Sequence, residues 1–382
     1  MNTKSLRTPA LLMIVLAPHV YGLPTMIRLG YPNCSSCHIA PQGAGLLTRY
    51  GRSVDQAQSL RGGEYAPWES AFSKIVNLDG RIVQDVRTVL QQQDVSTTGK
   101  PGTQILRGRF IYRNSIDLGK GFRVGGMITG ENTSAPRPSL AYEGPARPDQ
   151  LFVNTAMLSY RARPTLEFSA GRDQLPTGVN IADLTTFVRA RNKYGYYDSP
   201  TQAKAFWWSK RYLIAPYAYG PGGNELKGQH ENGEGIMAEF DVRGKQKTVV
   251  GLNLLHGTDA AVDRTMAGPY IRLGFGQWGI LAEHDITNRS LKTATRATSF
   301  GQAATYGQIF WAAREWLVPS LIVERLRVDR PYRESLNAAK LELAARLGSQ
   351  LTVTAGPRIQ RDEISSRISR SVVFQLAMKT VH

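Results

Sequence analysis

The residues best suited to carry chemistry are Cys34, Cys37 and His38, which form a C-x-x-C-H motif near the start of the 382-residue chain. This spacing is the attachment signal for a c-type haem, because two thiols three residues apart reach the two vinyl groups on one porphyrin edge. The histidine that follows lies under the ring and binds the iron from the proximal side. The motif predicts one covalent haem c, bound through Cys34 and Cys37, with His38 as the metal ligand.

Three other interpretations of the motif stay open. A disulfide between Cys34 and Cys37 is geometrically feasible, although so short a loop would stabilise a long chain little. A structural zinc site needs four ligands, and this stretch offers three. A thioredoxin-like redox pair would sit in a βαβ unit, which the sequence after the motif does not predict.

The motif leaves the second axial ligand of the iron undecided, and electron-transfer cytochromes usually supply a methionine or a second histidine there. Met26 is the first candidate because it is close to the motif in sequence, and water is an alternative. The remaining candidates lie further along the chain: Met127, His230, Met237, His256, His284 and His382.

No other catalytic constellation is present in the sequence. There is no Ser-His-Asp set, no glycine-rich phosphate loop and no paired metal ligands beyond His38, so neither a hydrolase nor a transferase is indicated. The formal net charge of +17 would suit nucleic acid, but the basic residues form no dense cluster and no nucleic-acid motif. We therefore expect no nucleic-acid partner and favour anionic solutes, lipopolysaccharide and acidic proteins.

Residues 1–22 resemble a secretory signal, with Lys4 and Arg7 before a short apolar core at residues 10–17. Export agrees with the motif, because covalent haem attachment takes place outside the cytoplasm. Residues 23–73 form the predicted haem segment, with a helix expected over residues 46–59. This segment is too small to bury a haem alone, so we expect it to dock against, or plug, residues 74–382.

From about residue 75 the apolar residues alternate with polar ones at a period of two, strand after strand. No run of about 18 apolar residues follows the signal, which excludes a membrane-spanning helix but not a β-barrel. In residues 104–113 the pattern sets arginines on one face and apolar residues on the other. If the apolar face meets lipid, seven basic residues point into the lumen: Arg107, Arg109, Arg113, Arg123, Lys340, Arg346 and Arg358.

The connections between these strands favour a membrane barrel over a soluble all-β domain, which shows the same period. Short turns alternate with longer polar links, as in barrels with tight periplasmic turns and long external loops. Short turns are predicted at residues 117–121, 163–164, 209–212, 243–246, 275–279, 315–319 and 347–350. The fold class is therefore all-β: a transmembrane outer-membrane barrel of about sixteen antiparallel strands, preceded by a short helical haem-binding segment.

Two further features follow from this strand map. Trp207, Trp208, Trp311 and Trp316 lie near turns, where an aromatic girdle would sit, with ordinary strand packing as the alternative. The longest link, residues 173–199, carries a predicted helix at residues 180–189. It either folds into the barrel as a constriction, contacts an external partner or is an ordinary surface loop.

A haem motif followed by such a barrel resembles the fused monohaem cytochrome c–porin proteins of iron-oxidising and related bacteria. The resemblance is carried by Cys34, Cys37 and His38, then Pro41, Leu46 or Leu47, and Tyr50-Gly51-Arg52, which is similar to that family's aromatic-Gly-Arg triplet. Close similarity covers residues 30–52, and the Gly43-Ala44-Gly45 insertion departs from the family's tighter spacing.

The resemblance implies electron transfer across the outer membrane, between an external donor or acceptor, which includes Fe(II), and a periplasmic cytochrome. The outer-membrane lipid would surround the barrel, and the haem segment would lie on the periplasmic side or in the lumen. Two alternatives stay open: a basic, anion-preferring porin with a haem-bearing plug or sensor, and a peroxidase-like haem enzyme.

Overall fold

The computed structural model describes residues 24–31, 34–42, 46–60, 82–100, 102–134, 151–179, 181, 186–192, 198–222, 231–242, 247–292, 297–348 and 350–379. The predicted export signal and the predicted boundary between residues 73 and 74 lie outside these ranges. Ahead of the barrel the chain forms two 3-10 helices, η1 (Pro24–Leu29) and η2 (Cys34–Ser36), and the helix α1 (Arg49–Ala57). Among the helices that the structure describes, none has the length and apolar character needed to cross a bilayer.

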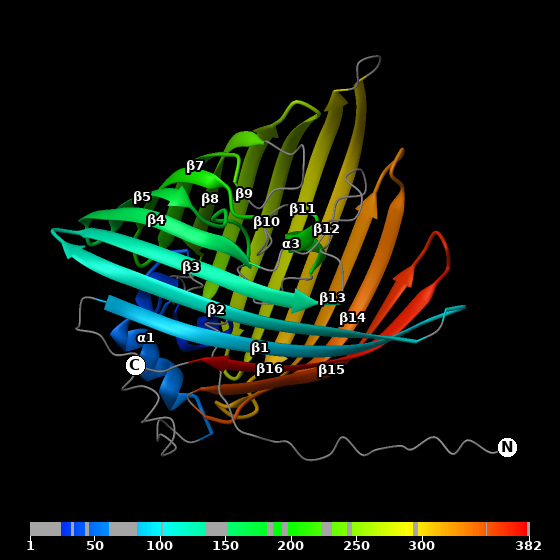
Figure 1. Cartoon of the computed structure of the whole chain (residues 1–382), viewed down its shortest axis with the longest axis horizontal. Helices are drawn as coiled ribbons and strands as arrows, with labels where there is room; N and C mark the ends of the chain where they lie inside the picture. Colours follow the sequence, from blue (N-terminus) through cyan, green and yellow to red (C-terminus); the bar gives the residue numbers. More distant parts are fainter. Residues whose placement is uncertain are drawn as a thin grey trace.

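The strands close into one antiparallel barrel, in which β1 pairs with β16 and all other neighbours are consecutive in sequence (Figure 1). Such closure leaves no unpaired edge in contact with lipid. The all-β fold and the predicted number of sixteen strands are confirmed. The strands are β1 (Ile82–Thr97), β2 (Thr103–Gly119), β3 (Phe122–Thr133), β4 (Leu151–Arg163), β5 (Leu166–Arg172), β6 (Thr201–Trp208), β7 (Tyr212–Gly220), β8 (Asn232–Asp241), β9 (Thr248–Thr258), β10 (Val262–Phe275), β11 (Trp278–Lys292), β12 (Ala297–Trp311), β13 (Leu317–Val328), β14 (Glu334–Arg346), β15 (Leu351–Asp362) and β16 (Ile368–Lys379).

The period-two pattern sets the two faces of the wall, as β2 illustrates. Arg109 and Arg113 are buried on the lumen side, whereas Leu106 and Phe110 are each 53% exposed on the outer side, where lipid covers them. All seven basic side chains predicted to point inward do so. Arg107, Arg109, Arg113, Lys340 and Arg346 are buried there, while Arg123 and Arg358 pair with Glu167 and Glu324.

The short turns predicted at residues 117–121, 163–164, 209–212, 275–279 and 315–319 lie where the sequence predicts them. Residues 243–246 and 349 of the other two lie outside the described residues, but strands end and begin on either side of both. One end of the barrel therefore carries the short connections together with the start of β1 and the end of β16. This is the periplasmic end. Three long links, predicted at residues 91–102, 256–264 and 287–301, are shorter than predicted, because β1 continues to Thr97, β10 already begins at Val262 and β11 continues to Lys292. Where a strand extends beyond the bilayer, both of its faces meet water and both carry polar residues. The sequence there resembles that of a loop, although the backbone hydrogen bonds between strands continue.

The predicted aromatic girdle is correct for only part of the tryptophan set. Trp207 and Trp311 face outward and are 51% and 40% exposed, and Trp311 stacks on Trp278 with ring centroids 5.7 Å apart. The prediction is wrong for Trp208, which is 9% exposed inside the lumen with the guanidinium of Arg161 over its ring. Adjacent strand residues point to opposite faces, so Trp207 and Trp208 could not share the girdle.

Candidate functional site

The C-x-x-C-H motif folds into one tight turn. η2 begins at Cys34, whose carbonyl oxygen accepts hydrogen bonds from the backbone N–H groups of Cys37 (3.2 Å) and His38 (2.9 Å). Residues three apart in such a turn lie on the same side, so the two cysteines face the same way. Both thiols are free, and His38 is buried with 6% of its surface exposed.

A small hairpin and α1 support this turn from behind. The N–H of Ile39 donates to the Leu46 carbonyl (3.0 Å), and His38 forms an isolated antiparallel β-bridge with Leu47. Thr48 then donates its N–H to the Cys37 carbonyl (2.8 Å), and its side chain caps α1 by accepting the N–H of Gly51 at 3.0 Å. The motif is therefore followed by a hairpin and a helix, and not by a βαβ unit.

The triplet Tyr50-Gly51-Arg52 has a physical role at each position. A Cβ at Gly51 would lie 2.9 Å from the Cα of Cys37, so only glycine lets α1 pack directly on the motif. Arg52 donates to the Leu47 carbonyl (3.2 Å), and the Tyr50 hydroxyl meets that of Tyr31. This hydrogen bond and burial raise the pKa of Tyr31 to about 12. Tyr50 is 52% exposed, and α1 covers only part of the helix predicted for residues 46–59.

Ionic and close backbone contacts attach residues 24–60 to the inner wall near the short turns. Arg28 pairs with Glu315 (2.5 Å) beyond the end of β12, and the backbone of Arg28 lies so close to Gly274 that a Cβ there would be 2.6 Å from its nitrogen. On the other side Arg346 of β14 pairs with Asp55, and its carbonyl accepts the N–H of Leu60 at 2.9 Å. α1 accordingly lies at the end of the barrel where β16 finishes (Figure 1).

The described residues of the longest link, 173–179, 181, 186–192 and 198–199, fold into the lumen and narrow it, which is the first of the three outcomes predicted for this link. Its helix α3 (Phe187–Ala190) is shorter than predicted and contacts β11, β12 and β13. The carboxylate of Glu283 accepts the N–H of Val179 (2.9 Å), and that of Asp285 accepts the side-chain amide of Asn192 (2.7 Å). Val179, Phe187 and Val188 are buried among inward-facing apolar residues of the wall.

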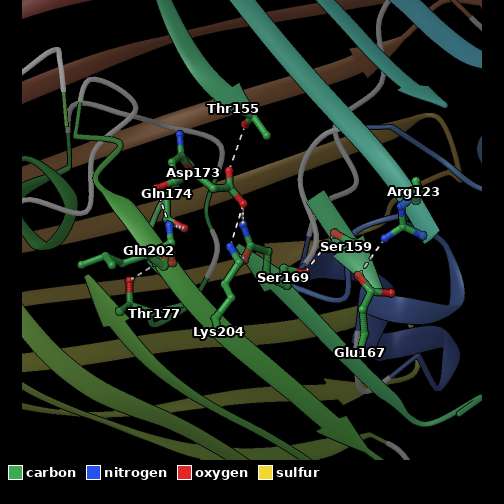
Figure 2. A network of polar contacts seen from close by, with 12 residues as sticks. Arg123, Thr155, Ser159, Glu167, Ser169, Asp173, Gln174, Thr177, Gln202 and Lys204 are labelled. Carbon is green, nitrogen blue, oxygen red and sulfur yellow. Dashed lines mark hydrogen bonds and ion pairs between the residues drawn. The ribbon is translucent and has the colours of Figure 1, made fainter. Parts of the chain in front are cut away.

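A second set of polar contacts joins the start of this link, the N-terminal segment (residues 24–60) and the wall. Figure 2 shows Lys204 of β6 pointing at Asp173, whose carboxylate also accepts the Thr155 hydroxyl (2.9 Å). The ammonium of Lys204 donates to Asp173 at 2.7 Å and to Gln42 of the N-terminal segment at 2.6 Å. Gln42 in turn donates to Asp173 at 2.8 Å.

Cys34 borders a narrow cavity where these three parts of the chain meet. The N-terminal segment contributes Cys34 and Gln42, and the constriction contributes Leu175, Gly178 and Arg189 among others. The wall contributes Leu213, Met237, Glu239 and Arg272. Burial raises the pKa of the Cys34 thiol to about 11, against the opposing charge of Arg272. Burial and the carboxylate of Asp55 raise the pKa of Cys37.

The structure narrows the set of candidate axial ligands. His256 is exposed on the outer face of β9, and His284 is on the outer face of β11 beside Thr305, so neither side chain points into the lumen. Met237 is 4% exposed and borders the cavity of Cys34, whereas Met26 accepts a hydrogen bond from Gln58 at its sulfur (3.4 Å). Met127 points inward beside Ile111 and Phe152. His230 and His382 lie outside the described residues.

Inward arginines are mostly paired with inward carboxylates. Glu131 pairs with Arg109 and Arg107, Asp85 with Arg113, and Glu239 with Arg272 (2.5 Å). A second group of inward side chains is apolar, although the sequence pattern predicted charged side chains in the lumen. Its members are Phe206, Trp208, Leu213, Leu281, Phe310, Ile322 and Leu326. Within the described part of the chain, no three His, Cys, Asp or Glu side chains gather as a metal site.

Comparison with known proteins identifies the fold. No protein-family model matches the chain, and no curated protein sequence matches it. Solved structures do match: Salmonella typhi OmpF in complex with daunomycin has a TM-score of 0.57 at 9% identity, covering 78% of this chain and 97% of that one. The anion-selective porin from Comamonas acidovorans has a TM-score of 0.55 at 9% identity, covering 78% and 99%. Pseudomonas putida OprB has a TM-score of 0.52 at 11% identity, covering 85% and 99%.

The fold and these matches define the class of protein. The chain is a porin-like β-barrel of the kind found in the outer membrane of Gram-negative bacteria. Residues 24–60 hold a C-x-x-C-H turn against the inner wall of this barrel.

Proposed function

We propose that this barrel carries one covalent haem c and transfers electrons across the outer membrane. The observation that carries the proposal is the folded turn at Cys34–His38. Its two cysteines form no disulfide and face the same side, His38 is buried next to them, and α1 packs closely behind the turn. The residues present fit the group, because these thiols can form the two thioethers and His38 can bind the iron. When bound, the haem would supply reversible one-electron chemistry at iron.

The protein's own residues would orient the group and shield it. Arg346 and Arg28 hold the segment at the periplasmic end, within reach of a soluble electron-transfer protein. The apolar side chains of the lumen and the constriction exclude water from the inner side. The Glu239–Arg272 pair next to Cys34 places fixed charge near the attachment point, which is one of the means by which a protein tunes a redox centre.

Reconstituted vesicles test the proposal. Purified protein is inserted into liposomes that enclose a membrane-impermeant electron acceptor, and a membrane-impermeant reductant is added outside. We expect the enclosed acceptor to be reduced only with the haem-bearing protein, and not with a variant that lacks both thiols. Equal rates for the two proteins, or the absence of haem from correctly exported protein, would refute electron transfer through this chain.

A basic, anion-preferring porin is the second candidate. It is favoured by the inward arginines of β2 and by the likeness of the barrel to the anion-selective porin from Comamonas acidovorans. Planar-bilayer recordings separate the two functions. A pore occupied by the haem segment and the constriction predicts a small conductance, whereas a large, anion-selective conductance in the haem-loaded protein would favour the porin.

Replacing Gly51 with alanine is expected to lower the yield of haem-bearing protein several-fold. The added methyl group overlaps the backbone of Cys37, so α1 must move away from the motif, and overpacking of this kind costs about 1–3 kcal/mol. The measurement is covalent haem per folded barrel, from haem staining and barrel-specific gel migration. Ser53→Ala, an exposed change on the same helix, is the matched control and should match the wild type.

Replacing Met237 with leucine is expected to change the visible spectrum of the oxidised protein. Met237 borders the cavity of Cys34, whereas the sulfur of Met26 already accepts a hydrogen bond from Gln58. Leucine preserves the volume but cannot bind iron, so loss of a sulfur-to-iron charge-transfer band in Met237→Leu, with the band retained in Met26→Leu, identifies the ligand. The reverse pattern would assign Met26, the candidate nearest to the motif in sequence.

A further inference from the structure

The outer face of the barrel carries a groove that the electron-transfer proposal does not use. It has a volume of about 850 Å³ and crosses the wall from β13 through β16 and β1 to the start of β2. The outward-facing side chains along it are mostly apolar: Leu321, Leu341, Pro357, Ile359 and Val372, with Arg370 at one end. A lipid-facing barrel surface is ordinarily a convex band, so a groove of this size can hold acyl chains in a fixed position.

The groove lies in the outer half of the membrane. Leu321 and Leu341 pair with each other near the middle of their strands, while Arg370 lies close to the start of β16, next to the loop that joins it to β15. That loop is at the end of the barrel opposite the short turns, which is the external end. The groove therefore runs from mid-membrane to the external interface.

Outward-facing arginines gather at this external end. Arg370 pairs across the strands with Ile359, and Arg361 is the next outward residue on β15 beyond Ile359. Arg325 and Arg361 both pair with Asn337, so they flank β14 in one row. Strands lie about 4.8 Å apart, so these two side chains are about 10 Å apart.

Two carboxylates share this region and do not neutralise it. Glu363 faces Arg325 and Arg361 and accepts hydrogen bonds from Ser335 and, at 2.6 Å, from Asn337. Asp94 borders the groove and accepts the side-chain amide of Gln104 at 3.0 Å. Arg325, Arg361 and Arg370 outnumber these two, and the further carboxylates at this end face other cations: Asp362 faces Arg367 of the adjoining loop, and Asp329 pairs with Arg327.

We propose that this groove is a binding site for lipid A, the phosphorylated acylated anchor of lipopolysaccharide. Its acyl chains would lie along Leu321, Leu341, Ile359 and Val372, and its phosphates would meet Arg325, Arg361 and Arg370. Arginine guanidinium groups bind phosphate oxygens through paired, charge-assisted hydrogen bonds. The occupant follows from position and charge, because lipopolysaccharide is the phosphorylated lipid of the outer leaflet that this end of the barrel contacts.

Native mass spectrometry of delipidated protein in detergent, titrated with purified bis-phosphorylated lipid A, tests the site. We expect one lipid A to bind about tenfold or more tightly than its dephosphorylated form. The combined change Arg325→Gln, Arg361→Gln and Arg370→Gln should weaken binding of lipid A by a similar factor, since each arginine contributes to holding an anionic lipid.

A matched variant at the other end of the barrel controls for general charge. Arg163→Gln, Lys210→Gln and Arg211→Gln remove three exposed cations at the short turns and should leave the affinity within about twofold of the wild type, as expected for cations remote from the phosphates. Leu341→Trp, which fills the groove without changing charge, should weaken binding as well. Equal losses in both charge variants, or equal affinity for lipid A and phosphatidylglycerol, would overturn the proposal. Haem content is expected to be unchanged in all variants, so this test is independent of electron transfer.

Discussion

Changing Cys34 and Cys37 to serine is expected to abolish covalent haem and to leave a folded, colourless barrel. The two thiols are the only ones in the chain, so no other residue can form thioether bonds. The wall depends on strand pairing between residues 82 and 379 and does not include the motif. The measurement is haem staining on a denaturing gel together with the reduced visible spectrum of protein extracted from outer membranes.

The control for this pair lies inside the motif. Ser36→Ala changes an exposed side chain between the two cysteines and should retain full haem content. Haem that persists in the double serine variant would show that the cofactor binds elsewhere. A wild-type protein that matures correctly without haem would instead favour the disulfide or zinc interpretations of the motif.

The wall was largely predictable from the sequence because a membrane barrel constrains every second residue. Arg109 and Phe110 are neighbours in the chain, yet one must face the lumen and the other must face lipid. The alternation of lumen-facing and lipid-facing residues is required only within the bilayer. For that reason the polar outer parts of β1 and β11 were predicted as loops, although their backbones remain paired.

The helix that packs behind the C-x-x-C-H turn was predictable for a different reason, whereas the haem itself stays a prediction. Cys34, Cys37 and His38 need a fixed local spacing, and Gly51 is needed where α1 meets the backbone of Cys37, so the chemistry and the packing are both visible in a short stretch. The partners of this stretch were not predictable. Arg272 and Met237 approach Cys34 from strands more than two hundred residues away, and an alternating pattern reports only which face a residue is on.

The apolar part of the lumen was missed because both faces of several strands are apolar. In β6, Phe206 and Trp208 point inward while Trp207 points outward, so no polar residue marks the inner face at that end. The constriction explains why these inward-facing residues are apolar. Val179, Phe187 and Val188 need apolar partners inside the barrel, and the wall of β6 to β14 provides them.

Removing the two carboxylates that hold the constriction is expected to release it toward the external mouth. Glu283→Ala with Asp285→Ala leaves the N–H of Val179 and the amide of Asn192 without their acceptors on β11. Each buried donor left without an acceptor costs about 1–3 kcal/mol, so the population of the released loop should rise by at least about thirtyfold. The measurement is the rate of tryptic cleavage after Arg189 or Arg191 in protein whose barrel stays folded.

Glu283→Gln with Asp285→Asn is the matched variant, because each amide oxygen can still accept the same hydrogen bond while the charge is lost. It should be cleaved far more slowly than the double alanine variant. Similar rapid cleavage in both would show that the negative charge beside Arg189, and not the hydrogen bonds, holds the loop. Wild-type protection in both would mean that the packing of Val179, Phe187 and Val188 is sufficient, and that the constriction is held by apolar contact alone.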